Sequence, residues 1–150
     1  MTPPLRLLVV SHAAVTPVNQ DLFARLEAQH GWQIEIVLPR RWKTEYGVRS
    51  AARWPAFRGP LRPLPVAMNG NIPLHFYLHP LGRVVRRAQP DVVYVHHEPY
   101  ALATAQVLRA AGRADLTFGV YGAQNLSKHF PWPVSRWERR VHARADFASP

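Results

Sequence analysis

The sequence predicts an α/β fold, a Rossmann-like three-layer domain with a mainly parallel sheet. Short apolar runs, typical of strands buried on both faces, recur at residues 5–11, 34–38, 92–96 and 116–121. Segments with helical periodicity lie between most of these runs, and such alternation is typical of parallel sheets covered by helices. The chain has 150 residues, 47% of them hydrophobic, which is enough for the core of one ordinary domain.

The first half of the predicted order is strand, loop, helix, strand. Residues 5–11 form the first strand, and residues 12–18 read as a loop because they contain Thr16-Pro17. Asn19 is expected to cap a helix that ends near Gly31. A second strand at 34–38 stops at Pro39.

Residues 40–71 are expected to be irregular, because Pro55, Pro60, Pro63 and Pro65 forbid a long helix. Short strands are possible within 63–68 and 72–78, the latter alternatively an extended loop. The remainder repeats the strand and helix pattern. A helix starts at Pro80, a strand covers 92–96, and an Ala/Leu-rich helix at 101–111 closes at Gly112. A strand at 116–121, a helix from Pro133 to about 145 and the start of a strand at 146–149 follow.

In a parallel sheet of this kind, ligands bind beyond the carboxyl ends of the strands. That rule selects the segments 11–19, 39–43, 96–100 and 122–128. The candidate substrate-binding residues are the polar and aromatic side chains of these loops: His12, Thr16, Asn19, His97, Glu98, Tyr100, Gln124, Asn125 and Lys128. Glu98 offers a hydrogen-bond acceptor for a polyhydroxylated ligand, or alternatively a charge near the start of the next helix. Gln124 and Asn125 offer both donors and acceptors, or alternatively an ordinary turn.

Metal binding is not expected from the spacing of the histidines. Adjacent side chains such as His96 and His97 point in opposite directions at the end of a strand, so both cannot easily face one ion. His75 and His79 are four apart, but the neighbouring Pro80 argues against a helix there. The sequence therefore predicts no metal site, and it assigns no catalytic residue.

The net charge of +10 is localised. Residues 40–62 carry seven cations against one acid, with tryptophans between them, and two predicted helices each carry several arginines on one face. Arginine beside exposed tryptophan suits an anionic membrane surface or single-stranded nucleic acid. Alternatively, the tryptophans belong to the core and the arginines lie on ordinary solvated faces. The candidate membrane or anion patch comprises Arg40, Arg41, Trp42, Lys43, Arg53 and Trp54.

Several function classes find no support. The chain has no cysteine, which excludes thiolate chemistry, and it contains no G-x-G-x-x-G, P-loop or G-x-S-x-G motif. The apolar run of residues 7–10 is too short for a signal peptide or a membrane span. We therefore expect a cytoplasmic protein whose membrane contact, if any, is peripheral.

Four stretches together resemble one family. They are the first strand through His12, the segment Ile34 to Trp42, the loop Pro90 to Tyr100, and Tyr121-Gly122-Ala123-Gln124-Asn125 leading to Pro131-Trp132-Pro133. The chain is similar, over nearly all its length, to the N-terminal domain of family 4-like glycosyltransferases. The resemblance implies the first half of a two-domain GT-B enzyme that transfers a sugar from a nucleotide-sugar, without metal and with retained configuration.

The resemblance also implies roles for the loops and partners. Residues His12 to Asn19 would face the donor phosphates and the acceptor, Glu98 and Tyr100 would line the acceptor side, and Gln124 and Asn125 would lie near the reacting centre. The acceptor would be a glycan or a lipid-linked glycan, and the nucleotide-sugar would be a co-substrate rather than a cofactor. The first loop departs from the family because it lacks the usual glycines.

The sequence ends at Pro150, inside the last predicted strand, so we expect residues 1–150 to be a truncated N-terminal domain without its donor-binding partner domain. Two other interpretations stay open. In the first, the chain is a non-catalytic basic module that binds acidic polymers or nucleic acid, of which nucleic acid is the less expected partner. In the second, the chain is an inactive stub. Preference for anionic vesicles over generic nucleic acid would favour the transferase.

Overall fold

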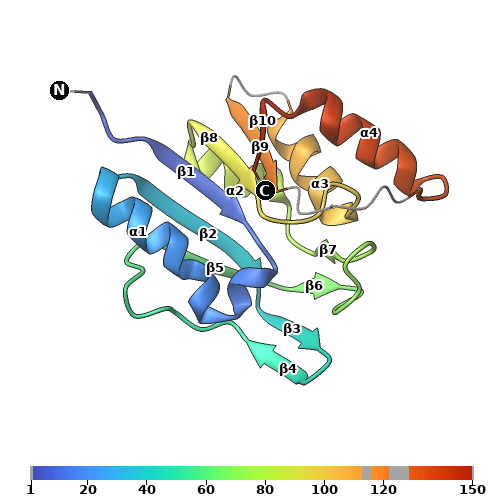
Figure 1. Ribbon diagram of the computed structural model, residues 1–150, viewed down its shortest axis with the longest axis horizontal. Coiled ribbons are helices and arrows are strands. Elements are labelled where there is room, and N and C mark those ends of the chain that lie inside the picture. Colours follow the sequence, from blue (N-terminus) through green and yellow to red (C-terminus); the bar gives the residue numbers. More distant parts are fainter. Residues whose placement is uncertain (1, 113–115, 122–128, 150) are drawn as a thin grey trace.

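A computed structural model describes residues 2–112, 116–121 and 129–149. Its centre is a six-stranded sheet in the order β10-β9-β8-β1-β2-β5, in which every neighbouring pair is parallel (Figure 1). This confirms the predicted α/β fold class and the parallel sheet. The strands are β1 (Arg6–Val10), β2 (Gln33–Pro39), β5 (Leu61–Leu64), β8 (Val92–Val95), β9 (Thr117–Tyr121) and β10 (Phe147–Ser149).

Strand β1 lies at the middle of the sheet because it is apolar on both faces. Its residues Leu7 to Val10 are all buried, and Val9 pairs with Ile36 of β2 on one side and Tyr94 of β8 on the other. Successive side chains of a strand point to opposite faces. Leu8 and Val10 therefore enter one buried cluster, and Leu7 and Val9 enter another.

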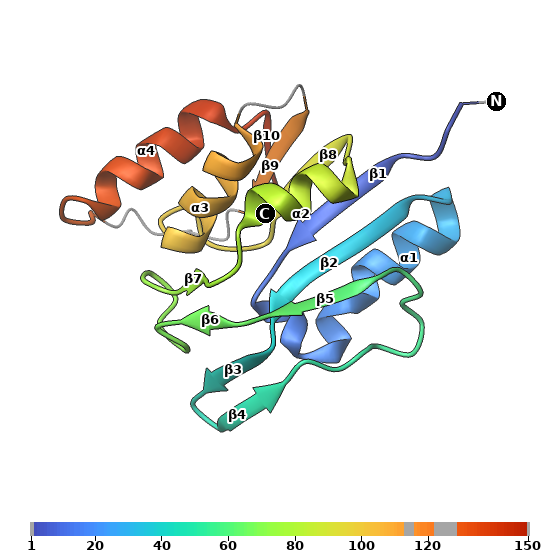
Figure 2. The same ribbon diagram turned by 180° about the vertical axis from the view of Figure 1, so that it is seen from behind.

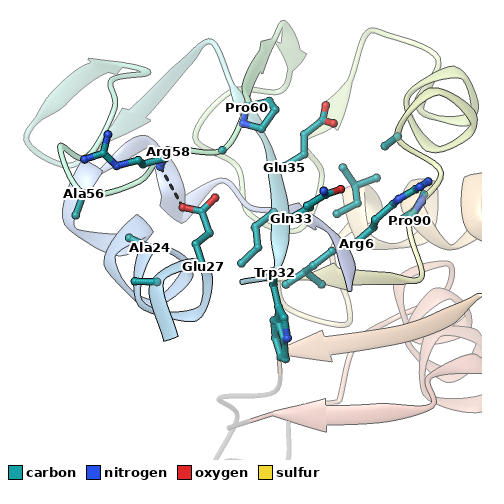
Figure 3. Close-up of a pocket in the computed structure, with 16 residues that line it drawn as sticks. Arg6, Ala24, Glu27, Trp32, Gln33, Glu35, Ala56, Arg58, Pro60 and Pro90 are labelled. Atoms are coloured by element: carbon teal, nitrogen blue, oxygen red, sulfur yellow. Dashed lines mark hydrogen bonds between the residues drawn. The ribbon is translucent and has the colours of Figure 1, made fainter. Parts of the chain in front are cut away.

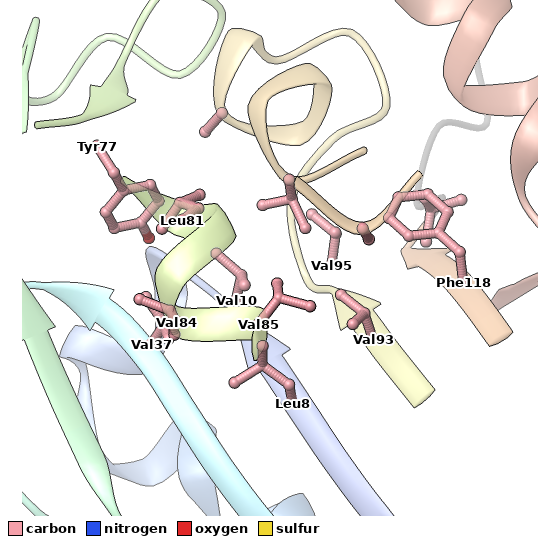
Figure 4. Close-up of a cluster of buried hydrophobic side chains, with 14 of the residues drawn as sticks. Leu8, Val10, Val37, Tyr77, Leu81, Val84, Val85, Val93, Val95 and Phe118 are labelled. Atoms are coloured by element: carbon pink, nitrogen blue, oxygen red, sulfur yellow. The ribbon is translucent and has the colours of Figure 1, made fainter. Parts of the chain in front are cut away.

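The α-helices of the described residues cover the two faces of the sheet unequally. They are α1 (Asp21–His30), α2 (Leu81–Ala88), α3 (Leu102–Ala111) and α4 (Val134–Arg144). Helix α1 packs Phe23 and Ala24 against the cluster that holds Val9. Helices α2, α3 and α4 lie on the other side, where Figure 2 shows them together, and their apolar residues join Leu8 and Val10 (Figure 4).

Helix ends follow the predicted signals in most places. Pro80, Ala101 and Pro133 are the N-caps of α2, α3 and α4, and Gly31 closes α1 in the left-handed region with φ 66°. The prediction for Asn19 is wrong by one residue. Two short 3-10 turns, Ala13–Val15 and Pro17–Gln20, precede α1, so its N-cap is Gln20.

Residues 40–60 contain no helix, as expected from their prolines. The segment instead begins with a hairpin of β3 (Arg41–Thr44) and β4 (Gly47–Ser50), which the sequence did not predict because every residue of β4 is exposed. Gly47 permits the turn with φ 119°. Further on, β6 (Val66–Ala67) pairs with β7 (Phe76–Tyr77), within the two segments where short strands were possible.

The arginines of α2 lie on a solvated face. Arg83, Arg86 and Arg87 of α2 are exposed while Val84 and Val85 are buried, which is the ordinary amphipathic arrangement. In the described part of the chain, no helix has both the length and the apolar character to cross a bilayer.

Candidate functional site

The candidate site lies at the carboxyl ends of β1 and β8, and these strand ends with the loops that follow them are called the crevice below. The chain passes from β1 to β2 on one side and later returns to β8 on the other side of β1, so the order reverses between these two strands. Open α/β sheets bind their ligands at such a point. Here the loops touch through polar side chains. Ser11 Oγ lies 3.1 Å from His96 Nδ1, and His12 Nδ1 lies 2.5 Å from His97 Nδ1.

The two neighbouring histidines after β8 point to opposite sides, as their adjacency predicts. The ring of His96 contacts Tyr121 edge-on at 4.6 Å between centroids, on the side of Phe23. The ring of His97 instead stacks on His12 at 4.7 Å and lies 5.1 Å from His75. The side chains at this edge therefore form two groups, one around His96 and one around His97.

Burial keeps these histidines uncharged at neutral pH. It lowers the pKa of His12 to about 3, with a further contribution from the nearby His75 and His96. Burial also holds the pKa of His97 well below its usual range, and it lowers the pKa values of His75 and His96. These rings therefore offer lone pairs and N–H donors to a ligand rather than positive charge.

Trp42 closes one side of the histidine cluster. Its ring centroid lies 4.8 Å from those of His12 and His75, and only 7% of Trp42 is exposed. The exposed membrane-facing role predicted for Trp42 is therefore wrong, because the indole fills the core beside β1 and β2. The alternative interpretation, that the tryptophan belongs to the core, is confirmed at this position.

The remaining cations of the candidate patch differ in the contacts that the described residues make. Arg40, Arg41 and Lys43 are exposed after β2, at the same edge of the sheet as the crevice. Arg53 instead donates to the carbonyls of Phe57 and Gly59, at 3.0 and 2.7 Å.

Trp54 is also tied into the structure. It is half-buried, and its indole N–H donates to Asp21 at 3.0 Å.

The other predicted site residues line the same edge with different exposure. Thr16 is half-buried and Asn19 is exposed, with the Asn19 amide donating to the carbonyl of Ala13 at 2.8 Å. Glu98 is half-buried, and its backbone carbonyl accepts from Thr104 Oγ1 at 2.8 Å. Tyr100 is 8% exposed.

Gln124, Asn125 and Lys128 were predicted to lie near the reacting centre. They fall outside the described residues.

Two functional candidates were missed at the level of sequence. His75 joins His12 and His97 although 63 residues separate it from the first and 22 from the second. No spacing rule signals such a group, because its members come from three segments. Ser11 lay in a segment predicted to bind ligand but was not among the predicted site residues. Its hydroxyl contacts His96 and also accepts from the backbone N–H of Ala14 at 3.2 Å.

A pocket of about 600 Å³ lies at the opposite, amino end of the strands (Figure 3). It is lined by the starts of β1 and β2, by α1 and by residues 56–60. Its acids are already paired. Glu27 accepts from the backbone N–H of Arg58 at 3.1 Å, and Glu35 pairs with Arg62 at 2.6 Å. Because these groups satisfy one another, the polar crevice at the carboxyl ends is the better candidate site.

Comparison with known proteins gives no relative. No protein-family model matches the chain, and neither the curated proteins nor the solved structures contain a significant match.

Proposed function

We propose that residues 1–150 are the acceptor-binding half of a glycosyltransferase, which transfers a sugar from a nucleotide-sugar to a glycan or lipid-linked acceptor. The observation that carries the proposal is the crevice between β1 and β8. Its polar loops meet at the reversal of strand order, where α/β proteins bind their ligands. The sequence resemblance supplies the reaction class.

The exposed cations after β2 support an anionic acceptor. Arg40, Arg41 and Lys43 lie at the same edge of the sheet as the crevice. Phosphate groups of a lipid-linked glycan would pair with guanidinium groups in two parallel hydrogen bonds. The same cations would favour an anionic bilayer, which supports a peripheral position at the cytoplasmic membrane face.

The crevice residues would place the acceptor rather than supply charge. Glu98 would accept hydrogen bonds from sugar hydroxyls, while the first loop from His12 to Asn19 would border the donor side. Holding a hydroxyl in position converts transfer into an effectively unimolecular step. Stabilisation of the departing nucleotide would come from a donor-binding domain beyond these residues.

The experiment measures ligand binding to the isotope-labelled chain through the changes in its NMR amide shifts. The probes are farnesyl diphosphate-linked N-acetylglucosamine as the acceptor mimic and a thymidine oligonucleotide. We expect the acceptor mimic to shift amides after β1, β2 and β8. The variants Glu98→Gln and Arg41→Ser should each weaken its binding at least fivefold. Glu27→Gln, in the pocket at the amino end, is the matched control and should leave the affinity unchanged.

Two outcomes would overturn the proposal. One is an acceptor mimic that shifts no amide at the carboxyl ends of the strands. The other is an oligonucleotide that binds these loops more tightly than the acceptor mimic, with the steep salt dependence of phosphate contacts, which would favour a basic nucleic-acid module.

A further inference from the structure

Three histidines from three separate segments converge beside the crevice. His12 follows β1, His75 precedes β7 and His97 follows β8. One ring nitrogen of each lies within 4.8 Å of the other two. The rings of His12 and His97 are nearly parallel, with an interplanar angle of 10°, and their Nδ1 atoms approach to 2.5 Å. The fold therefore brings three imidazoles from distant parts of the sequence together.

Hydrogen bonding shows which nitrogen of His75 carries a lone pair. Its Nδ1 lies 2.9 Å from the carbonyl oxygen of Ile72 and 3.1 Å from that of Asn71. A carbonyl only accepts, so Nδ1 carries the proton and donates it. In the neutral ring, Nε2 is then the atom with the free lone pair.

Two ring nitrogens of the cluster are buried without a partner among the described residues. They are Nε2 of His75 and Nε2 of His97, in side chains that are 0% and 1% exposed. Of the two, Nε2 of His75 is the lone pair that an ion beside the Nδ1 atoms of His12 and His97 would bind. Buried polar atoms in proteins are almost always paired with protein, water or an ion. Among the described residues, the rings of Trp42 and Tyr77 pack on the cluster.

We propose that His12, His75 and His97 bind one divalent transition-metal ion, with Zn²⁺ as the best match. Imidazole nitrogen is a preferred ligand of Zn²⁺, and three protein ligands leave a fourth position for water or another ligand. A histidine that binds metal usually donates its other N–H to a carbonyl or carboxylate, which fixes the ring. His75 already has this second interaction.

Small side-chain rotations would bring the nitrogens to coordination distance. With Zn–N bonds of about 2.0–2.1 Å, two tetrahedral ligand nitrogens lie about 3.4 Å apart. His12 and His97 would separate by about 1 Å, and the Nδ1 proton between them would move to Nε2 of the ring that donates it, so that both Nδ1 lone pairs face the ion. His75 would approach by no more than about 1.4 Å, because all three ligand atoms already lie within 4.8 Å of one another. His12 is the only one of the three that is not fully buried, so its side is the route of entry.

This site does not depend on the proposed sugar transfer, and it goes beyond what the resemblance implies. A bound ion would join the loops after β1 and β8 to the segment before β7. That link would fix one wall of the crevice, whichever ligand the crevice takes.

The test measures Zn²⁺ binding to the full chain, prepared without a histidine tag and treated with a chelator. We expect one Zn²⁺ per chain with micromolar or tighter affinity by competition titration. Co²⁺ should give the strong visible absorption of a tetrahedral site. His75→Asn is the key variant, because its amide can still donate to the carbonyls of Ile72 and Asn71 while the Nε2 ligand is lost. It should weaken Zn²⁺ binding at least 100-fold. His142→Asn, an exposed histidine on α4, is the matched control and should retain the affinity.

A second measurement does not require any variant to fold. Side-chain ¹⁵N shifts of the wild-type chain should change on adding Zn²⁺ for His12, His75 and His97, and not for His142. Binding well below one ion per chain, or equal loss in His75→Asn and His142→Asn, would overturn the proposal. So would Zn²⁺-induced shifts confined to exposed histidines.

Discussion

Gln20 is expected to be the most important polar side chain for stability outside the histidine cluster. It is 0% exposed and makes three hydrogen bonds with backbone groups. Its Nε2 donates to the carbonyls of Ala14 at 2.9 Å and Ala52 at 2.7 Å, and its Oε1 accepts from the N–H of Trp54 at 2.9 Å. The side-chain amide of Gln20 therefore connects the loop after β1 to the segment between β2 and β5 that contains Ala52 and Trp54.

The substitution Gln20→Met preserves length and approximate volume but removes all three hydrogen bonds. Each bond contributes about 1 kcal/mol net, and a buried group left without a partner costs about 1–3 kcal/mol. The N–H of Trp54 is the group most affected, because it loses its acceptor. We expect the free energy of unfolding to fall by about 3–5 kcal/mol.

The assay is urea unfolding followed by tryptophan fluorescence and circular dichroism. Gln29→Met, at an exposed position of α1, is the matched control and should change the free energy of unfolding by less than about 0.5 kcal/mol. Hydrogen exchange of the Trp54 amide should also be faster in Gln20→Met than in the wild-type protein. The dependence of the free energy of unfolding on urea concentration should stay the same. A Gln20→Met protein as stable as Gln29→Met, with unchanged exchange at Trp54, would refute the reasoning.

Two further predictions concern the edge of the sheet at β10. A Cβ at Gly119 would lie 2.0 Å from the ring of Phe147, so Gly119→Ala should cost about 1–3 kcal/mol of unfolding free energy, and much less in a Phe147→Ala background. An equal cost in both backgrounds would show that the ring is not responsible. The backbone N–H of Phe118, and then Arg144, hold the pKa of Asp146 below its usual 3.8. The carboxylate therefore stabilises the fold above that pH, and this contribution is lost as the pH falls through the folded-state pKa. Asp146→Asn should accordingly lower stability at pH 6 but not at pH 2, measured by urea unfolding at both pH values, and an equal loss at both would contradict the assignment.

The fold class was predictable because its signals are local. Continuous apolar runs give buried strands, and Pro80, Pro133 and Gly31 mark helix ends through their own backbone preferences. The β3–β4 hairpin was not predictable from alternation, since all residues of β4 face solvent.

The candidate site was predictable only in part. The rule for parallel sheets placed His12, His97 and Glu98 at one edge of the sheet. The rule could not predict that His75 lies beside them or that Trp42 is buried. Those contacts depend on how residues 40–77 fold back over that edge.

The central position of β1 has a consequence for how the chain folds during synthesis. Its two neighbouring strands, β2 and β8, lie at very different distances along the sequence. Beside β8, a hydrogen bond at the start of β1 joins Arg6 to Asp91, which are separated by 85 positions. At a synthesis rate of about 5–20 residues per second, roughly 4–17 s pass between the emergence of these two segments. During that interval one edge of β1 has no neighbour, so this is the stage at which the nascent chain is most exposed to mispairing with another strand.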